Sequence, residues 1–527
     1  MWACSHICEL SQRKDKTSAI TAAACFIRQR NVIRGPEAQQ VATPASSDVR
    51  ALFEYATIGA AQVICLAMKT LLIKHIHTLV TMDDERRELR DAAMLVHGAR
   101  VARVGHTADF AAIASSVDDV LDLKDRFIVL PGFVNTHHHF YQTLTRAVPQ
   151  TQSCELFAWL RYLYPIWARL DARCIYVSAQ MAAAELLLSG CTTTSDHLYL
   201  FPNDCTLDEE IRALQDLGMR FHAARGSMSI GESRGGLPPD SLCEHESAIL
   251  QDSQRLIERY HGNARHAMTR IALAPCSPFS VSRELMRDSA ILARAYPGVR
   301  LHTHLAESEL DVKFSRETFG MLPGDFAESL GWTGSDVWHA HCVHLDGTAL
   351  RRFAENGTGV AHCPSSNQRL GSGIAPVKRM LELGIPVGLG VDGAASNDGS
   401  NMLHEARAAC LLARAGAHDA AAMHPRTALE LATRGGARVL GRDDIGYLAE
   451  GMSADFIAMD IDRPQFAGAW DLVAAVILCQ PDSVDFNFVN GKKIVDQGRL
   501  VTAELPLAVP LFQRPSQSRA CAHRYRR

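Results

Sequence analysis

The sequence predicts an α/β protein built on a (β/α)8 TIM barrel, with a small β-sandwich domain assembled from both flanks. Strand-like apolar runs alternate with helical stretches between residues 127 and 440, as expected for β–α units around a parallel sheet. Eight such runs fall in this region, the number that a (β/α)8 barrel requires. Polar residues follow nearly every run, and these barrels keep their active sites at the C-terminal ends of their strands.

The eight predicted strands are short and separated by helical segments such as 179–188 and 284–295. The runs cover residues 127–139, 191–199, 219–227, 269–280, 299–307, 336–345, 357–367 and 386–396.

The segments on either side of this region have a different pattern of apolar and turn residues. Residues 69–126 and 441–505 contain short β-type runs with turn residues between them, so we expect them to form the two parts of the small β-domain around the catalytic barrel, 127–440. Residues 1–67 lack clear periodicity, and we interpret them as a poorly ordered extension rather than a targeting peptide. Residues 506–527 are interpreted as a C-terminal tail.

The composition is that of an ordinary globular enzyme and excludes several classes of protein. Hydrophobic residues make up 47% and charged residues 21% of the 527-residue chain. The formal net charge of -4 gives no basic footprint for nucleic acid. The 15 cysteines are scattered, which indicates reduced thiols and a cytoplasmic location. The longest apolar run near the N-terminus, 55–68, is too short to span a membrane.

Metal-binding residue types follow three of the predicted strands. His137 and His139 lie two residues apart on one face of the first strand, so both imidazoles can reach one ion. His304 ends the fifth run, and Asp392 follows the apolar eighth run. Strand ends one, five and eight can converge at the barrel mouth. Imidazole and carboxylate suit zinc, although the same donors can hold iron or manganese.

These motifs carry a family resemblance over roughly residues 69–505. The HxH after the first strand, histidines on the fifth and sixth strands, and the aspartate on the eighth resemble the amidohydrolase superfamily. Longer segments resemble its 8-oxoguanine deaminases, with triazine aminohydrolases and guanine deaminases as nearby relatives. These segments are HHHFYQTLTRA, ELLLSGCTTTSDHLYLFP, RGSMSIGESRGGLPPD, LAPCSPFSV, LHTHLAE, GVAHCPSSNQRL and GLGVDGAASNDGSNML.

The resemblance implies a hydrolase with one zinc ion per subunit, because the lysine of the binuclear branches is missing from the fourth strand. The implied ligands are His137, His139, His304 and Asp392. Asp392 would take a proton from the attacking water, and Glu307 would pass a proton to a ring nitrogen and then to the departing amine. His341 would polarise the reacting centre. The implied reaction converts 8-oxoguanine and water to urate and ammonia, in a homodimer.

Four further residues are candidates for substrate binding. Gln142 corresponds to a glutamine that hydrogen-bonds the purine in the resembling deaminases, and its amide offers both a donor and an acceptor. Cys276 ends the fourth strand, but a small buried apolar residue is an equal interpretation. Arg225 ends the third strand and could meet a substrate carbonyl, or form a surface ion pair. His197 follows the second strand and is expected to line the pocket.

Two alternatives to 8-oxoguanine deamination stay open at this point. One is an aminotriazine hydrolase or guanine deaminase, which would use the same residues on another heterocycle. The other is a barrel that has lost catalysis and serves as a binding partner. The intact ligand pattern and both proton-handling residues, Glu307 and His341, argue against the second alternative.

Overall fold

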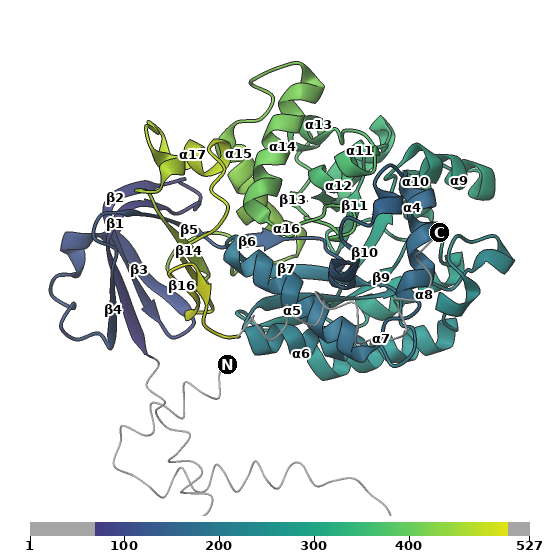
Figure 1. The fold of residues 1–527 in the computed structure, drawn as a ribbon, viewed down its shortest axis with the longest axis horizontal. Helices are drawn as coiled ribbons and strands as arrows, with labels where there is room; N and C mark the ends of the chain where they lie inside the picture. Colours follow the sequence, from purple (N-terminus) through teal and green to yellow (C-terminus); the bar gives the residue numbers. More distant parts are fainter. Residues whose placement is uncertain (1–68, 504–527) are drawn as a thin grey trace, which may run out of the picture. The chain divides into compact units, whose positions relative to one another are not determined.

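The computed structural model describes residues 69–503. The extension expected at 1–67 and the tail expected at 506–527 lie outside the described residues. Eight parallel strands close into a barrel in the order β10-β11-β12-β13-β6-β7-β8-β9, so the predicted (β/α)8 architecture is confirmed (Figure 1). The strands are β6 Phe133–Asn135, β7 Cys191–Leu198, β8 Arg220–Ser227, β9 Thr269–Pro275, β10 Arg300–Leu305, β11 Val337–His341, β12 Gly359–His362 and β13 Val387–Leu389.

Helices follow the barrel strands and cover their outer face (Figure 1). Because both faces are covered, strands such as β7 and β8 are buried at every residue. In chain order, the α-helices of the described residues, which include α4 over the barrel mouth and α17 between two strands of the outer sheet, are α4 Leu156–Trp167, α5 Ala172–Leu188, α6 Leu207–Leu217, α7 Glu246–Tyr260, α8 Arg283–Arg294, α9 Glu309–Phe319, α10 Pro323–Ser329, α11 Gly347–Asn356, α12 Pro364–Arg369, α13 Val377–Glu382, α14 Met402–Ala417, α15 Pro425–Glu430, α16 Gly436–Val439 and α17 Leu472–Leu478.

Capping residues in the sequence fix where several of these helices begin. Ser282, Ser308 and Asp346 each accept a backbone N–H of the first turn through the side chain, at α8, α9 and α11 respectively. Satisfying these donors sets the entry of the chain into each helix, and so fixes the length of the loop that precedes it. For α9 this loop carries Glu307, which places the glutamate at the barrel mouth.

The two flanks of the barrel pair with each other in a second, nine-stranded sheet. Its main path is β17-β16-β15-β14-β5-β1-β2-β3, and β4 pairs with β1. In Figure 1 the N-terminal strands of this sheet are purple and the C-terminal strands are yellow. The strands are β1 Thr70–Val80, β2 Glu88–His97, β3 Arg100–His106, β4 Asp119–Asp122, β5 Phe127–Pro131, β14 Phe456–Asp460, β15 Phe486–Val489, β16 Lys492–Asp496 and β17 Arg499–Leu500.

The chain leaves this sheet and enters the barrel within one residue. The sequence analysis places 127–139 in a single barrel strand, but Phe127–Pro131 pairs with β1 and β14 in the outer sheet, and barrel pairing begins at Phe133. Gly132 lies at the crossing point, where a Cβ atom would fall 2.1 Å from Thr192 Cγ2. The close approach of the two chains therefore requires glycine at this position.

Within residues 69–503, no helix combines the length and the apolar character that a membrane crossing needs.

Candidate active site

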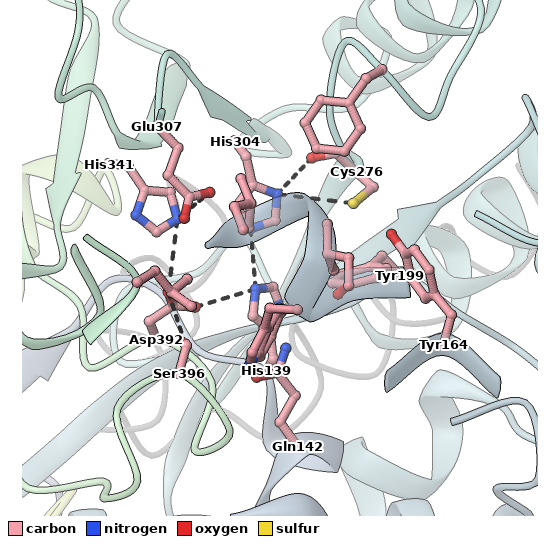
Figure 2. A pocket seen from close by; sticks show the side chains of 15 residues that line it. His139, Gln142, Tyr164, Tyr199, Cys276, His304, Glu307, His341, Asp392 and Ser396 are labelled. Carbon is pink, nitrogen blue, oxygen red and sulfur yellow. Dashed lines mark hydrogen bonds and ion pairs between the residues drawn. The ribbon is translucent and has the colours of Figure 1, made fainter. Parts of the chain in front are cut away.

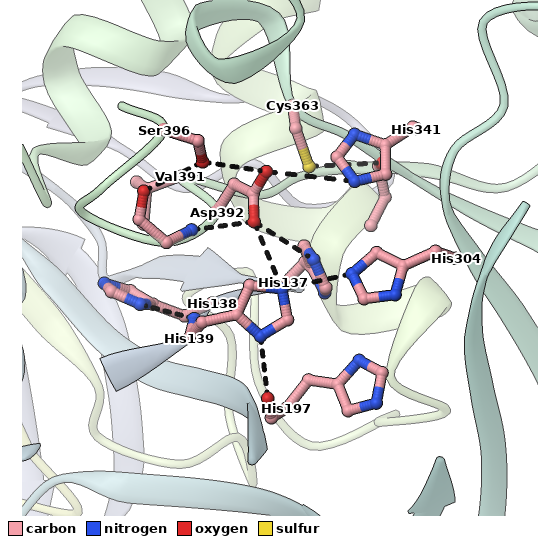
Figure 3. Close-up of polar contacts among 12 residues, drawn as sticks. His137, His138, His139, His197, His304, His341, Cys363, Val391, Asp392 and Ser396 are labelled. Atoms are coloured by element: carbon pink, nitrogen blue, oxygen red, sulfur yellow. Dashed lines mark hydrogen bonds and ion pairs between the residues drawn. The ribbon is translucent and has the colours of Figure 1, made fainter. Parts of the chain in front are cut away.

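Three histidines and an aspartate meet at the C-terminal end of the barrel strands (Figure 3). His137 and His139 follow β6, His304 lies near the end of β10, and Asp392 follows β13. Asp392 Oδ1 lies 3.3 Å from His137 Nε2 and 3.4 Å from His139 Nε2. All four side chains are buried or nearly so, although they come from three strands that are far apart in the sequence.

Each histidine of this cluster directs one ring nitrogen inward. The Nδ1 of His139 donates to the carbonyl of His197 at 2.7 Å, and the Nδ1 of His304 donates to the carbonyl of Cys276 at 2.6 Å. His137 Nδ1 lies 2.8 Å from His302 Nε2. These outer contacts fix the tautomers, so that each Nε2 keeps its lone pair for the centre of the cluster.

The inward nitrogens fit a metal ion. The Nε2 atoms of His139 and His304 lie 3.0 Å apart, with both Nδ1 protons committed elsewhere. Within residues 69–503, the buried His137 Nε2 makes no hydrogen bond, and it lies 3.3 Å from Asp392 Oδ1. Burial, followed by the charges of neighbouring histidines, lowers the pKa of His304 to about 3, so the ring is neutral. Converging lone pairs repel one another unless a cation lies between them, and imidazole with carboxylate is a donor set that zinc prefers.

The backbone around the acid is locally unusual. Asp392 has φ of +61° and His341 has φ of +70°, in the left-handed region that non-glycine residues seldom occupy. Burial alone would raise the pKa of Asp392, but contacts with His137 and His341 outweigh it and hold that pKa well below its usual range. Asp392 is therefore ionised and can accept a proton.

A second acid lies beside the cluster. Glu307 Oε2 is 3.4 Å from His341 Nε2, and the other ring nitrogen of His341 donates to Asn367 Oδ1 at 2.9 Å. Burial raises the pKa of Glu307 to about 7. Burial would lower the pKa of His341, but the carboxylates of Glu307 and Asp392 raise it overall. Glu307 can therefore exchange a proton near neutral pH.

A pocket opens over these groups, with an empty volume of about 390 Å³ (Figure 2). Its apolar wall comes largely from α4, through Leu156, Trp159 and Leu160. Flat aromatic and aliphatic walls suit a planar heterocycle. The full lining consists of His139, Gln142, Leu156, Trp159, Leu160, Tyr164, Tyr199, Cys276, Phe279, His304, Glu307, His341, Leu370, Asp392 and Ser396.

Two polar atoms of the pocket residues have no partner inside the protein. Gln142 Oε1 and the Tyr164 hydroxyl are buried, and neither makes a hydrogen bond within the described residues. Gly393 leaves the space for the glutamine, since a Cβ atom there would fall 1.9 Å from Gln142 Oε1. Buried polar atoms without partners are rare in native proteins, so these two are candidates for contact with a bound molecule.

The four candidate substrate-binding residues have different environments. Gln142 and Cys276 line the pocket, and burial raises the pKa of the Cys276 thiol to about 12, so the sulfur is uncharged. His197 lies behind the cluster, where its Nε2 donates to the carbonyl of Ala274 at 2.7 Å. His197 groups with His137, His139 and His304, whose ligand atoms all lie within 4.8 Å of one another, and it is not among the pocket-lining residues, so the prediction that it lines the pocket is wrong.

Arg225 is not among the pocket-lining residues. Its guanidinium donates to Glu244 at 2.8 Å and to Asp252 at 2.9 Å, and it stacks over the ring of Phe201. The ion-pair interpretation of Arg225 therefore describes this structure, although the side chain is 2% exposed rather than at the surface. The acidic partners come from the segment around α7, which the strand pattern could not reveal.

The sequence analysis did not single out Tyr164, Trp159 or Ser396 as pocket residues. Tyr164 and Trp159 belong to an apolar stripe on α4 with ordinary helical spacing, which predicts core packing equally well. The internal Pro165 is the one unusual signal in that helix. His302, whose Nε2 contacts His137 Nδ1, donates from its own Nδ1 to the carbonyl of Trp338 at 3.0 Å.

Comparisons with known proteins identify the class to which this fold and site belong. The family model described as "Amidohydrolase family" matches residues 128–498. The chain belongs to this family, and it is a hydrolase that acts on carbon–nitrogen bonds.

Two individual relatives and one solved structure show in more detail what this chain is similar to. The chain is 50% identical to 8-oxoguanine deaminase from Pseudomonas aeruginosa over 374 residues, which cover 70% of this chain and 83% of that protein. It is 37% identical to hydroxydechloroatrazine ethylaminohydrolase from Pseudomonas sp. over 448 residues, which cover 82% of this chain and 92% of that protein. Among solved structures, atrazine chlorohydrolase from Arthrobacter aurescens in complex with zinc gives a TM-score of 0.80 at 35% identity, over 84% of this chain and 99% of that one.

Proposed function

We propose that this protein is a zinc-dependent deaminase of a free purine base, which converts 8-oxoguanine and water to urate and ammonia. The observation that carries the proposal is the pocket, in which two proton-handling carboxyl groups and His341 border a histidine cluster under a flat aromatic wall. The 50% identity to an 8-oxoguanine deaminase supports the choice of substrate.

The residues that would hold the ion are His137, His139, His304 and Asp392. When bound, zinc supplies a Lewis acid that lowers the pKa of water towards about 7.

Asp392 and Glu307 divide the proton transfers between them. Asp392, which is ionised, accepts a proton as water adds to the carbon that carries the exocyclic amine. Glu307, with its pKa of about 7, donates a proton to the neighbouring ring nitrogen. The proton held by Asp392 then passes to the amine, the carbon–nitrogen bond breaks and ammonia leaves, and the new hydroxyl gives its proton to Glu307 as the carbonyl forms. His341 Nε2 lies between the two acids and stabilises the negative charge that develops on oxygen.

Gln142 and Tyr164 would orient the base. The unpartnered Gln142 Oε1 accepts a hydrogen bond from a ring N–H, and the Tyr164 hydroxyl donates to a carbonyl oxygen of the substrate. A base without the matching groups would leave both atoms buried and unpaired, and such a mismatch costs about 1–3 kcal/mol per group. The pocket would therefore distinguish oxidised purines from bases with fewer polar groups.

A substrate panel tests the proposal. Ammonia release by the zinc-loaded protein would be measured with 8-oxoguanine, guanine, isocytosine and an aminotriazine. We expect the highest kcat/KM for 8-oxoguanine, with urate formed in equal amount to ammonia. A higher kcat/KM for the aminotriazine would keep the reaction class and reject the substrate. Absence of turnover with every base, in protein that holds its metal, would reject the proposed function.

A further inference from the structure

The N-terminal end of the barrel contains a second cavity that the proposed reaction does not use. It has an empty volume of about 770 Å³. Its lining consists of Asn263, Arg265, Arg270, Gly298, Val299, Arg300, Asp336, Gly441 and Asp443. Arg300 is the first residue of β10, and His304 lies four residues further along that strand. At about 3.3 Å per residue, roughly 13 Å separates this cavity from the histidine cluster.

Positive charge exceeds negative charge in this cavity once the ion pairs are assigned. Arg265 pairs with Asp443 at 3.0 Å, and Asp336 pairs with Arg294 at 2.8 Å. Both acids of the cavity are therefore occupied by other arginines. Within residues 69–503, neither Arg270 nor Arg300 forms an ion pair within 4.0 Å, and the charges of Asp336, Asp443 and Asp444 offset their guanidinium charges only from a longer range.

Arg270 is buried, and Arg300 is half-buried. Arg270 is 7% exposed, and within residues 69–503 neither its buried Nε nor that of Arg300 has a hydrogen-bond partner. Their other contacts are with neutral groups, since Arg270 donates to the carbonyl of Gly441 at 3.2 Å and Arg300 donates to that of Val439 at 2.9 Å. Burying two like charges without a counterion is costly, because each loses hydration and repels the other.

The positive charge of the arginines contributes to lowered pKa values of nearby basic groups. His222 lies on β8 beside the cavity, and burial together with the charges of Arg442, Arg270 and Arg300 holds its pKa well below the ordinary value. Repulsion from Arg442 adds to burial in lowering the pKa of Arg270 to about 10. An anion in the cavity would offset these costs. Arginine pairs of this kind favour tetrahedral oxyanions, because a planar guanidinium donates two parallel hydrogen bonds to phosphate oxygens.

We propose that the cavity lined by Arg270 and Arg300 is a binding site for a phosphate group, at the opposite end of the barrel from the pocket. The group would replace the missing carboxylate between the two guanidinium ions. The cavity is open to solvent, so a free phosphate ion or a phosphate carried by a small metabolite can enter it. Because such a ligand binds only the folded chain, it would raise the melting temperature.

Thermal unfolding of the metal-loaded protein tests the site. Melting temperatures would be measured in inorganic phosphate and in a nucleoside monophosphate, each against chloride of equal ionic strength. We expect millimolar phosphate to raise the melting temperature by about 2 °C or more. A larger shift with the nucleotide would identify the ligand as a phosphorylated metabolite, and a larger shift with the free ion would identify it as phosphate itself. No shift with either would overturn the proposal.

Substitutions of Arg270 and Arg300 test whether the phosphate that raises the melting temperature binds in this cavity. Arg270→Gln/Arg300→Gln is expected to abolish the phosphate shift, while Arg287→Gln, an exposed arginine on α8, should keep it in full. If the double variant does not fold, the single variant Arg300→Gln carries the test and should lose most of the shift. A shift that persists in these variants, and that disappears when a competitive ligand fills the catalytic pocket, would place phosphate at the catalytic mouth and contradict the proposal.

Discussion

The two ends of the barrel treat their buried polar groups in opposite ways. At the C-terminal end, Gln142 Oε1 and the Tyr164 hydroxyl are buried without a hydrogen-bond partner within residues 69–503, and His137 Nε2 has only its ion pair with Asp392. At the N-terminal end, Arg220 makes two hydrogen bonds to Asp455, at 2.9 and 3.0 Å, and both side chains are almost completely buried.

The N-terminal arrangement repeats at a second ion pair. Arg442 donates to both oxygens of Asp444 at 2.8 and 2.9 Å, again with both partners out of contact with water. Closed hydrogen-bonding networks stabilise the fold, whereas open ones conserve donors and acceptors for a ligand. The C-terminal end, where buried polar atoms lack hydrogen bonds, is therefore the end that we expect to bind molecules. Arg270 and Arg300, which form no ion pair within residues 69–503, are the exception at the N-terminal end.

The largest effect is expected at the catalytic end. Glu307→Gln removes the acid that would protonate the ring nitrogen but keeps the size of the side chain. We expect kcat to fall by about 10²- to 10⁴-fold with little loss of metal. Glu309→Gln, an exposed glutamate on α9, serves as the matched control and should keep wild-type kcat. Equal activity of the two variants would show that Glu307 handles no proton.

At the closed end, the corresponding prediction concerns stability. Arg220→Met leaves Asp455 buried and uncompensated, and breaking a buried pair in this way costs about 3–5 kcal/mol. Arg126→Met breaks an ion pair with Asp460 in which the arginine side chain is 50% exposed, and we expect a loss below about 1 kcal/mol. Thermal unfolding of both variants measures the difference. Similar melting temperatures for the two would contradict the role assigned to the buried pair.

A smaller effect is expected from substitution of Tyr164, a residue that lines the pocket. Tyr164→Phe removes a hydroxyl that makes no hydrogen bond within residues 69–503, so the melting temperature should stay the same or rise slightly. Loss of its hydrogen bond to the substrate should raise KM for 8-oxoguanine by roughly 10-fold. Tyr296→Phe, whose hydroxyl bonds to Glu258 at the surface, is the control. An unchanged KM in Tyr164→Phe would remove this residue from substrate recognition.

The smallest effect is expected from Glu210, a buried acid that lines neither the pocket nor the N-terminal cavity. Glu210 on α6 is 0% exposed, and burial raises its pKa to about 8, beside Asp196, whose pKa is raised by burial and by Glu210. The folded protein therefore holds a proton that the unfolded chain releases near pH 4.5. Stability should fall as pH rises from about 4.5 to about 8.

Glu210→Gln should flatten this part of the stability profile and raise the melting temperature at pH 8 by about 2 °C relative to wild type. Glu209→Gln, one residue earlier on the same helix and paired with Arg212, should leave the profile unchanged. A wild-type stability that rises across this range would mean that Glu210 is ionised in the folded protein.

The sequence predicted the barrel and the residues that meet at its mouth because both depend on short-range patterns. Apolar runs with polar ends mark barrel strands, so the sequence alone assigns His137, His304 and Asp392 to one end of the barrel. The boundary at Gly132 was placed wrongly because residues 127–135 form one nearly continuous apolar run. Only the Pro131-Gly132 pair marks the change of sheet.

Features that depend on long-range packing could not be predicted in this way. Tyr164 lies on a helix whose apolar stripe resembles ordinary core packing, and nothing local shows that its hydroxyl faces a pocket. The acids that pair with Arg225 lie 19 and 27 residues away. The missing partners of Arg270 and Arg300 are visible only when every neighbouring carboxylate is located in space.

The metal content of the purified protein tests the central claim most directly. Wild-type protein and His304→Ala would be loaded with zinc, dialysed, and analysed by elemental mass spectrometry alongside ammonia release. The open histidine cluster predicts about one ion per chain in the wild type, with loss of both metal and activity in the variant. Wild-type protein without metal, or a His304→Ala variant that keeps its ion and full activity, would contradict the account of the catalytic end.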